Sequence, residues 1–248
     1  MKTLPPEARL TEAEAAAMCG VLVTRLGGSY SRLLDIRLAS RDSDEVFKWL
    51  VGAILLGAPL RADRAIAAYV ALNTHSLLNS TALAVVSEPV MVDLLRHSGV
   101  HEYARRLTST LRLVAGSVAG NYDNDINRLH FFADDANDIV CRLRSLGAGL
   151  SRRVVGLFLR EMGGVWDKSP QGISTLAIDA AHHLGFIEVR RHSDSASELR
   201  DVWERAAHGE RTFADFEAAL VRLCENYCSM RRCVACPMLK LCTSKAFL

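Results

Sequence analysis

The stretch "YCSMRRCVACPMLKLC" (residues 227–242) places four cysteines within sixteen positions near the end of the chain. From Cys228 to Cys242 their spacing is C-x4-C-x2-C-x5-C, and five of the seven cysteines lie in the last 25 residues. Short, unequal loops of this kind wrap a compact object, whereas a structural zinc site usually pairs two knuckles across a longer loop. The spacing predicts four thiolates on the corners of a [4Fe–4S] cluster. A zinc site and four plain buried thiols are the alternatives.

The predicted cluster ligands are Cys228, Cys233, Cys236 and Cys242. Cys224 lies one helical turn before Cys228 and is the alternative first ligand. The other two cysteines, Cys19 and Cys141, lie far from this group in the sequence, and we expect them to be core residues.

The composition is that of a protein with a packed core. Half of the 248 residues are hydrophobic, and the formal net charge of +2 is too small to imply a polyanionic partner by itself. Thr11 and Glu14 form a predicted helix capping box where a signal peptide would need an apolar run, and the apolar run at 49–60 is too short to cross a bilayer. We therefore expect a soluble, cytoplasmic protein with no membrane partner. Clustered cysteines in that compartment bind metal more often than they form disulfides.

Helical periodicity dominates the chain. Apolar residues recur at steps of three and four in segments such as "EVFKWLVGAILL" (45–56) and "SRRVVGLFLREMGG" (151–164), while alternating strand patterns are scarce. The pattern predicts an all-α fold of about ten short helices without internal repeats. The loop 163–172 is the expected seam between its two parts.

Two basic stretches stand out on this nearly neutral chain. Residues 142–160 contain five arginines and no acid, and residues 228–248 contain four basic residues and no acid. A glycine-containing turn that enters a helix, as within 146–162, exposes backbone N–H groups and forms a ready phosphate seat. Charge alone would suit solvated helix faces equally well. In combination with the turn and the cysteines, it predicts a nucleic-acid-binding face.

These features together resemble the helix-hairpin-helix DNA glycosylases of the endonuclease III class. The family spaces its cluster cysteines C-x6-C-x2-C-x5-C, so the last three cysteines fit and the first interval is two residues shorter here. "LGAGLSRRVVGLFLREM" (146–162) is similar to the family's hairpin. Three further segments follow the family's order: "DEVFKWLVGAILLGAPLRAD" (44–63), "HSGVHEYARRL" (97–107) and "ISTLAIDAAHHLGF" (173–186).

The resemblance implies a two-lobed, all-α glycosylase-like fold. Residues 1–43 and 167–248 would together form the lobe with the cluster loop, and residues 44–166 a helical barrel lobe that carries the hairpin at about 141–162. The implied partner is double-stranded DNA, and no protein partner is predicted. Leu60 and Val100 lie where the family pushes side chains into the gap left by a flipped base. The implied DNA-binding residues are Gly147, Gly149, Ser151, Arg152, Arg153, Leu60, Arg61, Val100, Arg231 and Arg232.

The family's two catalytic positions are changed in this sequence. The catalytic Asp falls at Ser174, whose hydroxyl carries no negative charge to stabilise a cationic sugar. The lysine that forms a Schiff base falls at Arg153, which stays protonated and cannot attack as a free amine. Asp167 is the substitute acid that we consider, although a surface turn residue is its simpler reading.

Three functions follow as hypotheses. The first is a base-excision DNA-repair protein that flips and excises a damaged or modified base without lyase activity, its enzyme status left open by the two changed positions. The second is a catalytically inactive DNA-binding module on the same scaffold. The third is an iron–sulfur redox or sensor protein, in which the hairpin and the arginines would lack a purpose.

Overall fold

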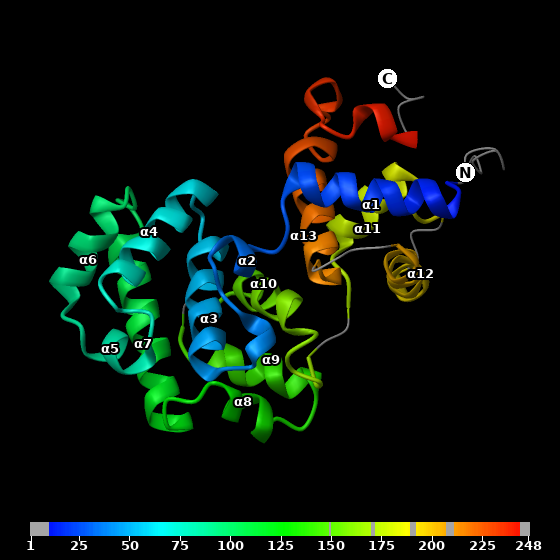
Figure 1. Cartoon of the computed structure of the whole chain (residues 1–248). Coiled ribbons are helices and arrows are strands. Elements are labelled where there is room, and N and C mark those ends of the chain that lie inside the picture. The colour runs from blue at the N-terminus through cyan, green and yellow to red at the C-terminus, as the bar shows by residue number, and fades with distance from the viewer. Residues whose placement is uncertain (1–9, 149, 170–171, 189–191, 207–210, 244–248) are drawn as a thin grey trace. The chain divides into compact units, whose positions relative to one another are not determined.

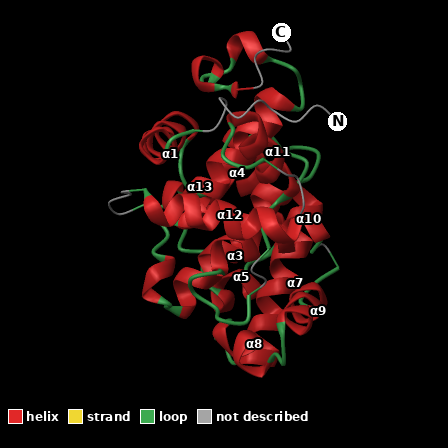
Figure 2. Cartoon of the chain, turned by 90° about the vertical axis from the view of Figure 1, so that its right-hand side faces the viewer, coloured by secondary structure: helices red, strands yellow, loops and turns green. Residues whose placement is uncertain are grey.

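The computed structural model describes residues 10–148, 150–169, 172–188, 192–206 and 211–243. Within these ranges the chain consists of helices and loops and contains no strand (Figure 2). The all-α expectation is therefore confirmed. No helix in the described part of the chain has the length and apolar character needed to span a bilayer.

The chain divides into two compact units. Unit 1 comprises residues 1–29 and 172–248, and unit 2 comprises residues 30–171. The first boundary lies earlier than residue 43, because Leu34, Ile36 and Leu38 are buried in the hydrophobic core of unit 2. The second lies a few residues later than 166.

Unit 2 is built around α3, whose sequence is apolar on almost every side. Eleven of its fifteen residues are buried, as expected for a helix without a polar face. Asp42 caps its N-terminus by accepting the backbone N–H groups of Asp44 and Glu45. The helices of unit 2 are α2 (Tyr30–Leu33), α3 (Ser43–Gly57), α4 (Ala62–Thr74), α5 (Ser80–Val85), α6 (Glu88–His97), α7 (Ala104–Tyr122), α8 (Asn127–Phe132), α9 (Ala136–Ser145) and α10 (Arg152–Met162) (Figure 1).

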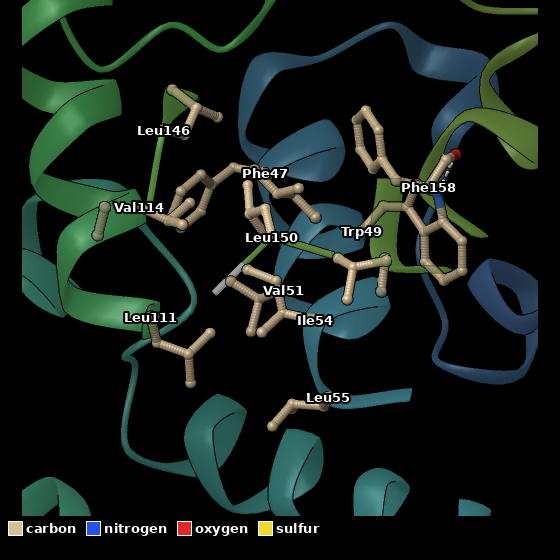
Figure 3. Packing of buried hydrophobic residues seen from close by; sticks show 14 of the residues in the cluster. Phe47, Trp49, Val51, Ile54, Leu55, Leu111, Val114, Leu146, Leu150 and Phe158 are labelled. Atoms are coloured by element: carbon tan, nitrogen blue, oxygen red, sulfur yellow. Dashed lines mark hydrogen bonds between the residues drawn. The ribbon is translucent and has the colours of Figure 1, made fainter. Parts of the chain in front are cut away.

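The core of unit 2 joins α3 to the segment between α9 and α10. Figure 3 shows Phe47, Val51 and Ile54 of α3 in one cluster with Leu146 and Leu150. In the same cluster, the indole N–H of Trp49 donates to the carbonyl oxygen of Phe158 at 3.0 Å. This packing holds α10 against the central helix.

Unit 1 combines the N-terminal helix with the C-terminal part of the chain. Its helices are α1 (Glu12–Leu26), α11 (Thr175–Leu184), α12 (His192–Arg205) and α13 (Phe213–Leu223). Both α1 and α11 pack on α13, around a core that includes Phe216 stacked on Trp203. The predicted capping box of Thr11 and Glu14 is present at the start of α1, and Thr212 and Asp215 form a second one at the start of α13.

Candidate cluster loop and nucleic-acid interface

The cysteine loop continues directly from α13. The helix widens into a π-helical turn over Cys224–Cys228, in which the N–H of Ser229 donates to the carbonyl oxygen of Cys224 at 2.9 Å. Two 3₁₀ turns follow, Cys233–Ala235 and Leu239–Leu241, joined by loop residues. Each tight turn closes on a backbone hydrogen bond, which fixes the local path of the chain between the cysteines.

The four predicted ligands are all partly buried. Cys228, Cys236 and Cys242 pack against the hydrophobic core of unit 1. Loss of solvent raises the pKa of the Cys228 thiol to about 12, and the negative charges of the other four thiolates of the loop add to the rise. The thiols are thus close enough to repel one another when ionised, which a bound cation would relieve.

The donor chemistry of this loop fits an iron–sulfur cluster. The segment 228–242 contributes four thiols and no carboxylate, and thiolates are the ligands that these clusters use. As the side chains lie, no three His, Cys, Asp or Glu residues of the described ranges are close enough together to hold a metal ion. Cys224 differs from Cys228 because it is buried, with its sulfur 3.4 Å from the hydroxyl of Ser229.

Two arginines lie within the cysteine loop. Arg231 and Arg232 are both exposed and lie between Cys228 and Cys233. Arg231 adopts the left-handed backbone conformation, with φ of 52°, which turns the chain sharply at this point. The loop therefore presents two adjacent guanidinium groups to solvent.

The turn between α9 and α10 leads into a helix start that carries two arginines. Gly147 packs so closely that an added Cβ would lie 3.1 Å from Cγ2 of Val114. Ser151 caps α10 by accepting the N–H of Val154 at 3.3 Å, and Arg152 and Arg153 follow, exposed, as the first two helical residues. Two cations thus flank the positive end of a helix dipole. Gly149 lies outside the described residues.

The two residues predicted to insert into the gap left by a flipped base differ in their burial. Leu60 is half-buried against the core of unit 2, and the neighbouring Arg61 pairs with Asp63 through two hydrogen bonds of 3.0 and 3.1 Å. Val100 is wholly buried, with 0% of its surface exposed. Its N–H donates to the carbonyl oxygen of Leu95, and this turn directs the side chain into the core. The prediction that Val100 is a wedge is therefore wrong.

Ser174 occupies the N-cap position of α11, but its hydroxyl makes no capping bond. Instead, the backbone N–H of Ser174 donates to Oε1 of Glu217 at 2.9 Å. Glu217 belongs to α13 and is only 4% exposed. Sequence reasoning missed this residue, although an acid in the apolar run "FEAALV" (216–221) is an unusual feature.

Asp167 lies in unit 2, on the wall of a pocket of about 500 Å³. Its side chain is 83% exposed, and Oδ1 lies 2.6 Å from Nε2 of His130, whose ring stacks on Trp166 at 5.3 Å. A slight loss of solvent acts to raise the pKa of Asp167, but the hydrogen bond and charge of His130 outweigh it and lower that pKa. Asn127 and Arg41 also line this pocket. Asp167 is thus a paired surface carboxylate, and sequence reasoning did not identify its partner His130.

The cysteine loop and α11 belong to unit 1, whereas the α9–α10 turn and Asp167 belong to unit 2. Each unit therefore carries one of the two basic segments, with Ser174 and Glu217 in unit 1 and Asp167 in unit 2. No protein-family model matches this chain, and no curated protein matches it.

Proposed function

We propose that this chain is a DNA-binding iron–sulfur protein of the base-excision type, which flips a damaged or modified base out of duplex DNA and releases it. The observation that carries the proposal is the cysteine loop after α13. It carries five partly or fully buried thiols, with Arg231 and Arg232 exposed between Cys228 and Cys233. Binding to the phosphate backbone of DNA requires such a basic surface, whereas a redox function in the cytosol does not.

Cys228, Cys233, Cys236 and Cys242 would hold a [4Fe–4S] cluster. Cys228 suits the first position better than Cys224, because Cys224 is buried and in contact with the hydroxyl of Ser229. When bound, the cluster supplies a rigid anchor for the loop. The loop itself does the binding, since its arginines form bidentate hydrogen bonds with phosphate oxygens.

The α9–α10 turn of unit 2 provides the second DNA contact. A phosphate placed there would receive hydrogen bonds from the first N–H groups of α10 and from Arg152 or Arg153. Leu146 and Leu150, on either side of this turn, are buried in the core of unit 2, and this burial would help to hold the donors in place. In the proposed function this turn acts as the hairpin of a helix-hairpin-helix motif, which would bind DNA through backbone N–H groups without reading its sequence.

Arg153 cannot form a Schiff base, so the released product would be an intact strand with an abasic site. The absence of a carboxyl group at Ser174 favours a second candidate function, a binder that has lost base release. The two functions share the fold, the cluster and the DNA surface, and they differ only in chemistry at the start of α11.

A panel of duplexes, each with one modified base, tests the proposal. We expect strand breaks on at least one duplex after alkali treatment and none before it. Breaks that appear without alkali would contradict the chemistry proposed for Arg153. Tight binding to every duplex with no product on any would establish the inactive binder in place of the enzyme.

A further inference from the structure

Glu217 is an acidic residue on the buried face of α13. Its neighbours Phe216 and Ala218 are buried in unit 1, and the Glu217 side chain itself is 4% exposed. A carboxylate in such surroundings is costly unless hydrogen bonds compensate for lost water. One such bond is the 2.9 Å contact from the backbone N–H of Ser174 to Oε1.

This contact places the carboxylate of Glu217 at the start of α11. The first N–H groups of a helix lack intrahelical partners, and the helix dipole favours negative charge there. A capping side chain commonly meets both needs, but the hydroxyl of Ser174 makes no such bond. Glu217 therefore accepts, from a different helix, the N–H of the N-cap residue, which is the bond that an acid at the third helical position makes in a capping box.

We propose that Glu217 provides the anionic group of the base-releasing site, in place of an acid at position 174. This inference rests on the proposed function. In the reaction the bond between C1′ and the base nitrogen breaks, and its electron pair leaves with the base, which takes up a proton. Water then adds to C1′ and gives its proton to solvent. The negative charge of Glu217 stabilises the positive charge that develops on the sugar between these events.

The variant Glu217→Gln distinguishes a catalytic role of Glu217 from a purely structural one. Glu217→Gln keeps the side-chain shape and an oxygen that accepts the N–H of Ser174, and it removes only the charge. We expect base release to slow at least about 100-fold, with DNA affinity nearly unchanged. Glu204→Gln removes an exposed carboxylate from α12 of the same unit and serves as the matched control, for which we expect no change.

Rescue separates charge from structure more sharply. In Ser174→Asp alone, two carboxylates would lie within hydrogen-bond reach and repel each other. The double variant Ser174→Asp with Glu217→Gln has a single carboxylate, which is moved from position 217 to position 174. We expect the double variant to recover most of the activity that Glu217→Gln loses, and to exceed the activity of Ser174→Asp. A residue that only holds α11 in place could not be replaced in this way.

The outcomes also separate this inference from the proposed function. Wild-type base release with an equal rate in Glu217→Gln would overturn the role of Glu217 and leave the function standing. No base release from any duplex would overturn the function. In that case the melting temperatures test whether Glu217 is charged. If it is, we expect Ser174→Asp to melt at least about 3 °C below the double variant. Equal melting temperatures would overturn a charged Glu217 at this position.

Discussion

The backbone N–H of Ser31 donates to Oε2 of Glu161 at 2.9 Å, and the N–H of Tyr30 donates to Oε1 of the same carboxylate at 2.8 Å. Burial raises the pKa of Glu161, although these hydrogen bonds oppose the rise. One residue earlier, the N–H of Ser29 donates to buried Asp215 at 2.7 Å. Two buried carboxylates therefore hold this part of the chain. Asp215 binds Ser29 within unit 1, and Glu161 binds Tyr30 and Ser31 within unit 2.

The raised pKa of Glu161 predicts a pH-dependent stability. The folded state keeps the proton above the ordinary pKa of 4.5, at which the unfolded chain releases it. The contribution of this proton is therefore full below that value and is lost as pH rises through the raised pKa. We expect the free energy of unfolding of the wild type, relative to Glu161→Gln, to fall as pH rises above the ordinary pKa of 4.5 in urea denaturation. A difference that is constant or grows with pH would contradict this account.

A second prediction concerns the contact of α3 with α10. A Cβ added at Gly57 would lie 2.6 Å from Cγ2 of Val154 and 3.1 Å from its Cα, so backbone would have to move. We expect Gly57→Ala to lower the free energy of unfolding by about 1–3 kcal/mol, despite alanine's better helix propensity. Gly156→Ala in α10 is the control: nothing lies within 4 Å of its added Cβ, and we expect a gain of roughly 0.5–1 kcal/mol. Equal stabilities of the two variants would show that the two helices do not approach so closely.

The arginines at the start of α10 predict a salt effect on DNA binding. Because Arg153 would neutralise one phosphate, Arg153→Gln should weaken binding to all sequences alike. It should also reduce the slope of log affinity against log salt by about 0.9. Arg96→Gln, at an exposed arginine of α6 in the same unit, should change neither quantity. Fluorescence anisotropy over a salt series measures both variants, and an unaltered slope in Arg153→Gln would remove this residue from the DNA surface.

The same residue should fail as a nucleophile. Arginine remains protonated at any accessible pH, so borohydride should trap no covalent adduct between this protein and abasic DNA. An adduct that forms with the wild type and disappears in Arg153→Ala would show that Arg153 acts as a lyase nucleophile, and would contradict this prediction.

Local features of the fold were predictable from the sequence. Helical periodicity indicated the all-α class, and the Thr11–Glu14 capping box depends on residues only three apart. Such features need no knowledge of how distant segments pack, which is why sequence patterns reveal them.

The expectation that Cys141 is a core residue is wrong, because it is exposed on α9, whereas Cys19 is buried as expected. The other features that sequence reasoning missed depend on distant contacts. Glu217 meets Ser174 across 43 positions, and His130 meets Asp167 across 37. Val100 follows a glycine and resembles an exposed turn residue, yet the packing of unit 2 buries it completely. Periodicity reports which face of a helix is apolar, and it does not report which other helix covers that face.

The central claim is that the loop from Cys228 to Cys242 binds an iron–sulfur cluster, and iron and sulfide analysis of protein purified without oxygen tests it most directly. We expect a brown protein with broad visible absorption and about four iron and four sulfide per chain. Loss of both in Cys228→Ser, with retention in Cys224→Ser, would identify the first ligand. A colourless wild-type protein that holds zinc, or no metal, would contradict the account.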